Sequence, residues 1–542
     1  MSHINHEQQQ PRSILDQLLA DQRANINVIT YKINNFYADG NTIIEADTLI
    51  EPIFLNSTHG LKIYQDYIIF IFSMAIFRLW GNTETIIAEH SIGDGIYCEL
   101  LQQTPNEKIL QQLKDEVCKI VEQQIKIERV TLTVAKASEI LKEFKRDDVL
   151  KNINFHGQRY IELYRAADYF DYYPSLLPPN TACKVVFDLV LFHQGLIIRC
   201  PKDKDFQISK KFVLPKLLFT QNQEHDKWLK ILKVDTVGDI NQLIINHQIS
   251  EFILTEEALH EKKIASLADH IKEKKTVKFV LIAGPSSSGK TTFAKRLAIQ
   301  LRVNGFIPYC FGLDDYFLPR AQTPKLPNGD YDFETIMALD IKLINKDLTS
   351  LLNGDEITLP RYNFHTGERE TSKHQLRFCN ESIVIIEGIH ALNELLTSSI
   401  AESFKTKIYI SALNQLNIDH HNRIPTTDCR RIRRIVRDAQ FRGYSAEETL
   451  KRWPAVREGE ESYIFPFQEQ ADYMFNSSLT YEIGVLKKYV LPLLRAINYQ
   501  SQVYNDAQDL IALVSHFLDI KDEHVINNSL LREFIAHSLF EY

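Results

Sequence analysis

"KFVLIAGPSSSGKTTFAKRLAIQL", residues 278–301, decides the fold of this chain of 542 residues. A strand-like apolar run leads into the pattern Gly284-x-x-x-x-Gly289-Lys290-Thr291, and a stretch with helical spacing follows it. This is the setting of a phosphate-binding loop, in which backbone N–H groups and a helix N-terminus surround the phosphates. In such a loop the lysine reaches the β- and γ-phosphates and the threonine hydroxyl ligates Mg²⁺. The stretch predicts nucleotide binding, and a glycine-rich turn that binds nothing is the alternative.

From about residue 275 to residue 495 the sequence alternates between strand-like and helix-like segments. Three of the predicted strands are near-continuous apolar runs, as expected of parallel strands that are covered on both faces. The alternation predicts an α/β doubly wound domain. The predicted strands are "KFVLIAG", "YCFGL", "SIVIIEGI", "KIYISA" and "YMFNS".

Carboxylates follow two of these predicted strands. Glu387 comes directly after four apolar residues in "IVIIEGIHAL", where a second metal ligand is expected. Asp314 and Asp315 follow the strand in "CFGLDDYF", and a carboxylate there can orient a hydroxyl group and take its proton. The alternatives are a solvated loop charge for Glu387 and a turn or N-cap role for the aspartates.

A basic stripe is predicted in "CRRIRRIVRDAQFRG", where Arg430, Arg433, Arg434 and Arg437 fall at helical spacing. Four cations on one helix face repel each other unless anions meet them. In a nucleotide enzyme those anions are the transferring phosphoryl group and its neighbours. A solvated or RNA-facing basic helix is the alternative.

Composition favours a soluble protein, with 44% hydrophobic and 24% charged residues. The formal net charge of −8 argues against a protein that coats nucleic acid. Seven scattered cysteines without a CxxC pair predict reduced thiols and a cytoplasmic location. The most apolar run, "IIFIFSMAIF" at 68–77, is about half as long as a bilayer span, so we expect a buried helix and no membrane contact.

The phosphate loop, the two carboxylate motifs and the arginine stripe, in this order, resemble the uridine kinase and phosphoribulokinase family of P-loop kinases over about residues 275–495. The resemblance rests on "GPSSSGKTT", "LDDYF", "YDFETIMALD", "PRYNFHTGER", "IIEGIHAL" and "RRIRRIVRDAQFRG". It implies a parallel five-stranded sheet with an arginine-bearing lid, and phosphoryl transfer from ATP with Mg²⁺.

The resemblance also implies residue roles. The catalytic base falls on Asp314, and Mg²⁺ ligation falls on Thr291 and Glu387. The remaining catalytic groups are Lys290 and the lid arginines Arg430, Arg433, Arg434 and Arg437. The residues implied to bind ATP are Gly284, Ser286, Ser287, Ser288, Gly289, Lys290, Thr291 and Thr292.

The acceptor side departs from the family's pattern. Uridine–cytidine kinases bind ribose hydroxyls with an Asp where this chain has Glu334, and Asp332 is a candidate substitute. They read the pyrimidine with a His five residues after a Tyr, and the fifth residue after Tyr362 is Gly367. Hydrogen bonds to the base are the contacts that distinguish one nucleoside from another most strongly, so this departure weakens the prediction of pyrimidine specificity. The residues expected to contact the acceptor are Glu334, Tyr362, His365 and Arg369.

The chain is most similar to a long nucleoside or uridine kinase subfamily, whose N-terminal region resembles the TGS and second additional domains of threonyl-tRNA synthetase. "EPIFLNSTHGLKIYQ" and "HSIGDGIYCEL" carry this resemblance, which implies an α+β region. Phe70 and Met74 stand where the synthetase module has an HxxxH zinc pair. Apolar side chains cannot ligate zinc, so we predict no zinc and no aminoacyl-tRNA editing.

The predicted domains are a flexible lead (1–24), a shortened TGS-like segment (25–60), a second-additional-domain-like region (61–230), a helical linker (231–274), the kinase domain (275–495) and C-terminal helices (496–542). The predicted reaction is ATP- and Mg²⁺-dependent phosphorylation of a nucleoside 5′-hydroxyl. A kinase of another small alcohol, such as a phosphorylated sugar or a pantothenate-like compound, and a nucleotide-gated RNA-binding or regulatory protein are the alternatives. The preferred acceptor and donor, the formation of a homo-oligomer and a nucleic-acid partner for the N-terminal region stay open.

Overall fold

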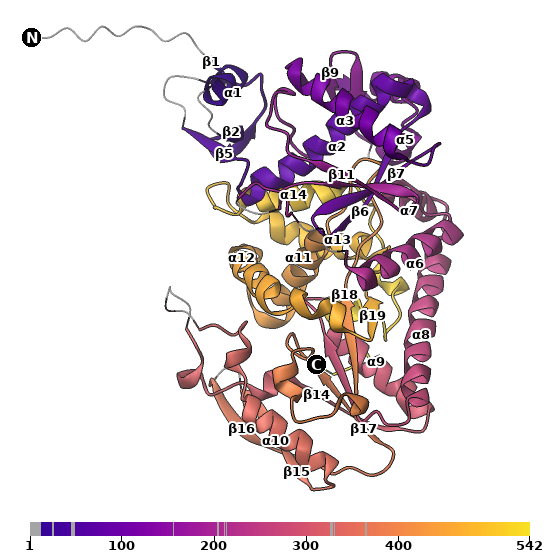
Figure 1. Cartoon of the computed structure of the whole chain (residues 1–542), viewed down its shortest axis with the longest axis vertical. Coiled ribbons are helices and arrows are strands. Elements are labelled where there is room, and N and C mark those ends of the chain that lie inside the picture. Colours follow the sequence, from indigo (N-terminus) through magenta and orange to yellow (C-terminus); the bar gives the residue numbers. More distant parts are fainter. Residues whose placement is uncertain are drawn as a thin grey trace, which may run out of the picture.

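The computed structural model describes residues 12–23, 27–44, 49–155, 157–202, 205–210, 212, 214–325, 329, 331–363 and 366–541. The protein is elongated, with the N-terminal elements at one end and the hairpin of strands β15 (Ile357–Asn363) and β16 (Glu368–Leu376) at the other (Figure 1). The phosphate loop lies between these ends. All seven cysteines are free thiols.

The phosphate loop belongs to a sheet of five parallel strands in the described part of the chain, in the order β14-β17-β13-β18-β19. All five strands predicted from the sequence are confirmed. Their bounds are Phe279–Ala283 (β13), Ile307–Gly312 (β14), Ser382–Glu387 (β17), Lys405–Ser411 (β18) and Tyr473–Asn476 (β19). The central strand β13 is buried along its whole length, which explains its continuous apolar sequence.

Helices cover both faces of this sheet. Val280 and Ile282 pack with helices α8 (Ile249–Glu273) and α9 (Lys290–Val303), whereas Phe279 and Leu281 face the side of α10 (Ile341–Leu352). This alternation follows the two-residue period of a strand. Helix α8 lies within the segment 231–274 that is predicted as a helical linker, and its buried side packs against the phosphate-loop helix α9.

The N-terminal region is built around helix α2 (Thr58–Trp80), which is buried from Tyr67 to Ile76. The buried helix predicted at 68–77 is therefore confirmed. By length and composition α2 could cross a membrane, but 72% of its apolar window is buried inside the protein, as in a core helix. Phe70 and Met74, the positions aligned with zinc ligands, lie in this core, and Phe70 contacts the ring of Tyr169 at 5.6 Å.

Two antiparallel sheets flank α2 in the described residues, in the orders β11-β12-β7-β6 and β10-β9-β8. Strands β11 and β12 form an antiparallel pair, and helix α3 packs against α2. The bounds are β6 Ile86–Ile92, β7 Gly95–Leu100, β8 Ile127–Thr133, β9 Tyr160–Ala166, β10 Tyr169–Asp171, β11 Asp188–Phe192, β12 Gly195–Arg199, α3 Glu107–Glu122, α4 Val134–Glu143 and α5 Asp147–Ile153.

The prediction of a flexible lead at residues 1–24 is wrong for residues 12–23, which form strand β1 and helix α1. Helix α1 (Ile14–Arg23) buries Ile14 and Leu18, spaced one helical turn apart, against Val28 and Tyr31 of β2. Residues 1–11 of that lead lie outside the described residues. The small strands here are β1 Arg12–Ser13, β2 Val28–Ile33, β3 Phe36–Ala38, β4 Ile43–Ile44 and β5 Ile50–Phe54.

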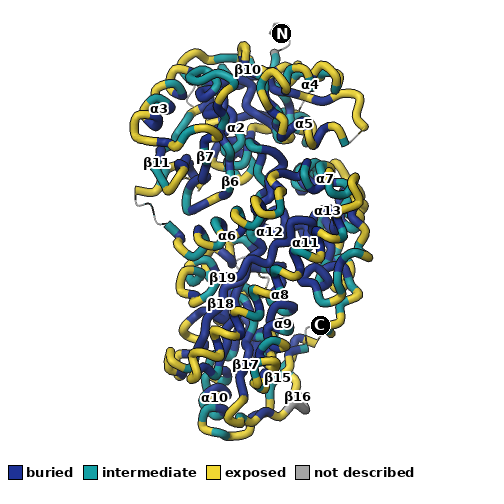
Figure 2. The backbone as a smooth tube through the Cα atoms, turned by 90° about the vertical axis from the view of Figure 1, so that its right-hand side faces the viewer, coloured by how far each residue is buried: buried dark blue, intermediate teal, exposed yellow. Residues whose placement is uncertain are grey.

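The C-terminal helices lie between the N-terminal region and the parallel sheet (Figure 1). They form a core with α7, α8 and α11, and the chain then returns to α9, so that the C-terminus lies near this helix (Figure 2). Helices predicted for residues 496–542 are found as α14 and the short α15. The bounds are α6 Lys216–Leu232, α7 Val237–Ile245, α11 Thr426–Arg437, α12 Ala446–Tyr463, α13 Glu482–Arg495, α14 Tyr504–Ser515 and α15 Arg532–Ile535.

Candidate active site

The phosphate loop connects β13 to α9 at the carboxyl end of the central strand. Gly284 lies against β18, and a Cβ at this position would come within 2.0 Å of the Ile410 carbonyl oxygen. Gly289 has a φ of +82°, in the left-handed region that favours glycine. Both motif glycines are therefore required by the backbone path of the loop.

Polar groups of the loop are available to a ligand. The hydroxyl groups of Ser287 and Ser288 are buried and form no hydrogen bond within the described residues. Lys290 Nζ donates to the carbonyls of Gly284 and Pro285, both at 3.0 Å, and burial lowers the pKa of Lys290. Because buried polar groups are normally satisfied, spare hydroxyls beside a buried amino group suit an anionic ligand.

Thr291 and Glu387 meet at the end of two neighbouring parallel strands. The Thr291 hydroxyl donates to Glu387 Oε1 at 2.9 Å. Burial raises the pKa of Glu387 to about 7, although the positive charge of Lys290 opposes the shift. A hydroxyl and a carboxylate are hard oxygen ligands, so this pair fits Mg²⁺. No group of three or more His, Cys, Asp or Glu within the described ranges could hold a metal, so Mg²⁺ would keep water or phosphate oxygens as its other ligands.

Asp314 lies beside this pair because β14 runs parallel to β17, with Gly312 opposite Glu387. Its side chain is exposed to solvent, but the surrounding protein limits its hydration and raises its pKa. The charges of Lys290 and Arg437 oppose that shift. Asp315 instead accepts the Tyr362 N–H at 3.4 Å. The structure therefore separates the two aspartates, with Asp315 supporting the hairpin and Asp314 facing the cations of the site.

The four arginines of the predicted stripe lie on α11, and the helix is confirmed, but their surroundings differ. Arg430 and Arg433 are buried, and they pair with Glu460 of α12 and Glu482 of α13. Arg430 Nε also donates to the carbonyl of Ser286 at 2.9 Å. These two arginines thus already have protein carboxylates as partners.

Arg434 and Arg437 are only partly buried. Arg434 donates to the Ser286 hydroxyl at 2.9 Å, and Asp438 contacts Arg434 at 3.3 Å and Arg437 at 2.9 Å. A π-helical turn at 438–442 extends α11, and Arg442 at its end interacts electrostatically with Asp314. The α-helical spacing of the arginine stripe does not include Arg442, because the π-helical turn changes the number of residues per turn. Its place in "RRIRRIVRDAQFRG" is the only sequence signal for Arg442.

Two further carboxylates contact backbone N–H groups of the phosphate loop and were not foreseen. Glu460 Oε1 accepts the Ser286 N–H at 3.0 Å, and Glu533 Oε2 accepts the N–H of Thr292 at 3.2 Å. Both come from outside the motif, from α12 and from α15. The sequence predicted a role for neither position.

The acceptor side is formed by the β15–β16 hairpin and the segment that precedes α10. Tyr362 is buried on β15, with its ring 5.6 Å from that of Phe317. Arg369 on β16 forms an ion pair with Asp340 at 2.9 Å. His365, predicted to contact the acceptor, lies outside the described residues. The structure thus places Tyr362 next to the turn of the hairpin, packed on Phe317, and gives Arg369 a protein partner.

Glu334 interacts electrostatically with Lys290 of the phosphate loop and with Asp314 and Arg434 beside it. Burial raises its pKa to about 7; Arg434 and Lys290 oppose the shift, and Asp314 adds to it. Asp332 accepts the N–H groups of Glu334 and Thr335, at 3.1 and 3.2 Å, and so closes a local turn. This turn accounts for Asp332, which leaves Glu334 as the carboxylate that faces the site.

The base-reading position of the family is occupied by a glycine for a structural reason. Gly367 has a φ of +73°, and a Cβ there would lie 2.6 Å from Nε of Arg320. The Gly367 carbonyl also accepts the N–H of Arg320 at 2.8 Å. A histidine could not adopt this position without moving Arg320.

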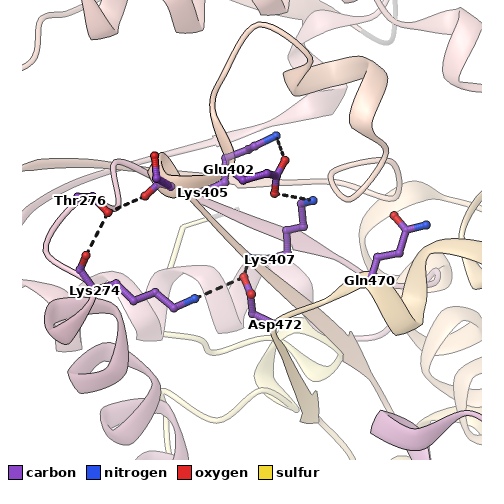
Figure 3. A pocket seen from close by; sticks show the side chains of 8 residues that line it. Lys274, Thr276, Glu402, Lys405, Lys407, Gln470 and Asp472 are labelled. Carbon is purple, nitrogen blue, oxygen red and sulfur yellow. Dashed lines mark hydrogen bonds and ion pairs between the residues drawn. The ribbon is translucent and has the colours of Figure 1, made fainter.

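A separate pocket of about 350 Å³ lies at the opposite, amino-terminal ends of the strands (Figure 3). Its lysines already have carboxylate partners. Lys405 and Lys407 pair with Glu402, and Lys274 pairs with Asp472 at 3.6 Å (Figure 3). Because each of these three lysines is already paired with a carboxylate, none of them is free to bind an anion, and the candidate site remains at the phosphate loop.

Comparison with known proteins agrees with this location. Residues 279–483 match the model described as "Phosphoribulokinase / Uridine kinase family". A "Uridine kinase" of Staphylococcus epidermidis is 27% identical over 194 residues, which are 35% of this chain and 83% of that protein. A "Uridine kinase" of Schizosaccharomyces pombe is 30% identical over 179 residues, 33% of this chain and 35% of that protein.

Among solved structures, "Structure of a Possible Uridine Kinase from Bacillus stearothermophilus" is 21% identical and matches 40% of this chain and 98% of that one, with a TM-score of 0.28. The matches to the family model and to the curated relatives confirm the predicted P-loop kinase domain for residues 279–483. The synthetase-like character of the N-terminal region stays a prediction.

Proposed function

We propose that this chain is an ATP- and Mg²⁺-dependent kinase that phosphorylates the 5′-hydroxyl of a nucleoside. The observation that carries the proposal is the meeting of Lys290, the Thr291–Glu387 pair and Asp314 at the carboxyl ends of adjacent parallel strands. Phosphoryl transfer needs phosphate binding, charge neutralisation and an oriented hydroxyl in one place. The curated relatives named Uridine kinase support a nucleoside as the acceptor.

In this proposal the loop amides and Lys290 bind the β- and γ-phosphates. Thr291 and Glu387 hold Mg²⁺, which neutralises negative charge on the phosphates when it is bound. Asp314 accepts the proton of the acceptor hydroxyl, and its exposure allows an acceptor to reach it. Arg434, Arg437 and Arg442 stabilise the charge of the transferring group, whereas the buried Arg430 and Arg433 position α11 and the loop.

Glu334 binds acceptor hydroxyl groups in this proposal. A kinase of another small alcohol is the second candidate, and Gly367 favours it, because the position that reads the base in uridine–cytidine kinases is here a glycine and offers no side chain. Arg369 does not replace that reading group, since it is paired with Asp340. The catalytic groups are the same for both candidates.

The test is an ADP-release assay with ATP and Mg²⁺ across nucleosides, sugars and sugar phosphates. Stimulation by at least one nucleoside, lost in Asp314→Asn, is the expected result. Stimulation only by a sugar or another alcohol would favour the second candidate, and no stimulation by any compound would contradict both.

A further inference from the structure

Glu533, near the end of the chain, is bound to the first turn of the phosphate-loop helix. Its Oε2 accepts both the backbone N–H of Thr292, at 3.2 Å, and the Thr292 hydroxyl, at 2.7 Å. The first N–H groups of a helix have no partner inside the helix, and in a phosphate loop they are donors to phosphate. An N–H that donates to this carboxylate is not available to a phosphate oxygen, so the two anions compete for it.

Apolar contacts hold Glu533 in this position. Leu530 is fully buried in the core formed by α9 and the parallel sheet, and its Cδ2 lies 3.5 Å from where a Cβ on Gly289 would be. Phe534, also buried, lies with its ring 5.2 Å from the guanidinium of Arg433. The segment 529–535 therefore contacts the phosphate loop on one side and the arginine helix α11 on the other.

The two carboxylates at the loop differ in their charge environment. Glu460 forms ion pairs with Arg430 and Arg457, so its charge is neutralised locally. Among the ion pairs of the described residues, none includes Glu533. Its charge also acts on Lys290 and Glu387, the groups expected to meet the phosphates and the metal. Because no ion pair neutralises the Glu533 carboxylate, its negative charge repels a phosphate group that approaches the start of α9.

We propose that Glu533 is an internal anion that competes with the nucleotide for the start of α9, so that the 529–535 segment gates the phosphate loop. ATP then binds fully only when this segment moves away from Thr292. The proposal rests on nucleotide binding at the phosphate loop, as in the proposed function, and it does not depend on which acceptor is phosphorylated. The contact with α11 means that displacement of the segment also changes the surroundings of Arg433.

The test measures ATP binding to the full chain by titration calorimetry, with Mg²⁺ and without acceptor. Glu533→Gln keeps an oxygen that can accept from Thr292 but removes the charge. Charge-assisted hydrogen bonds are about twice as strong as neutral ones, so we expect a Kd for ATP that is lower by about tenfold, or 1.4 kcal/mol. Glu523→Gln, an exposed carboxylate of the same C-terminal segment, is the matched control and should bind ATP like the wild type.

An unchanged or higher Kd in Glu533→Gln would overturn the gate, as would the absence of ATP binding in both proteins. Hydrogen exchange gives a second measurement on the wild type. The amides of Glu533 and Phe534 are hydrogen-bonded to Leu530 and Leu531, and ATP should make them exchange faster. Slower exchange would show that the segment closes on the nucleotide and would refute the competition. A chain that binds ATP in this pattern but phosphorylates no nucleoside would contradict the proposed function and leave the gate standing.

Discussion

Replacement of Glu334 by glutamine should stabilise the protein at alkaline pH while it weakens acceptor binding. Burial raises the pKa of Glu334 to about 7 from an ordinary value of 4.5. At 1.36 kcal/mol for each pKa unit, the buried charge costs at most about 3 kcal/mol of folding free energy. Glu334 is only partly buried and solvent screens its charge, so we expect the glutamine variant to gain about 1–2 kcal/mol.

The sign of this effect follows from proton binding. Between about pH 4.5 and pH 7 the folded protein holds the Glu334 proton that the unfolded chain has released. Wild-type stability therefore falls as the pH rises through this window, and it stays lower above pH 7. Glutamine has no such proton, so the advantage of Glu334→Gln should be present at pH 8 and close to zero at pH 4.5.

The assay is urea unfolding at both pH values, with Glu356→Gln as the control because Glu356 is an exposed carboxylate just before β15. The control should match the wild type at both pH values. The burial argument would be refuted if Glu334→Gln is less stable than the wild type at pH 8. It would also be refuted if the difference in free energy of unfolding between variant and wild type is the same at pH 4.5 and pH 8. In the kinase assay the same variant should raise the acceptor KM about tenfold, since a charged hydrogen bond becomes a neutral one.

Other substitutions test the remaining groups of the site. Asp314→Asn should lower kcat by about 10²–10⁴-fold, measured in stopped assays, while calorimetry shows an unchanged ATP affinity. The wild-type kcat should fall as the pH drops through the raised pKa of Asp314, because the protonated carboxyl cannot accept the hydroxyl proton. Arg433→Ala should lower the free energy of unfolding, measured with denaturant, by about 3–5 kcal/mol, because the substitution leaves the Glu482 carboxylate buried without its cationic partner. Arg437→Ala should lower kcat about 10²–10³-fold with little loss of stability, and equal stability losses in these two arginine variants would contradict the division of the stripe. Gly367→Ala should lower the free energy of unfolding by about 1–2 kcal/mol, seen as a lower midpoint temperature in a thermal melt. An unchanged midpoint temperature would contradict the left-handed backbone at this position.

The parts of the fold that the sequence predicted are those specified by local patterns. The inner strands β13 and β17 are buried on both faces, so their apolar runs are continuous and visible without a partner strand. The phosphate loop is equally local, because Gly284 and Gly289 are required by the backbone within one strand–loop–helix unit. Helix α1 was not predicted, because among its residues with described burial only Ile14 and Leu18 are buried, against the small sheet beside it.

The parts that could not be predicted depend on contacts between distant segments. Helical spacing places Arg430 and Arg433 on one face of α11, but the same spacing would result whether they met a phosphate or a protein carboxylate. Their carboxylate partners lie 30 and 49 residues away in the sequence. Glu533 lies 241 residues from Thr292, and the sequence predicted no role for it. Local sequence patterns therefore indicate which residues gather at the site, whereas contacts between distant segments decide which of those residues are free to bind a ligand.

The N-terminal region is structurally connected to the candidate site through the loop that leads into α11. Arg146 donates to Asp419 of this loop at 2.9 Å, and Asp171 contacts His421 Nδ1 at 2.7 Å. All four side chains are buried, and removal of one partner from such a pair typically costs about 3–5 kcal/mol. Because α11 starts only five residues after His421, these contacts fix the point from which the arginine helix begins. The geometry of Arg434 and Arg437 over the phosphate loop thus depends on residues of the N-terminal region as well as on the kinase domain itself.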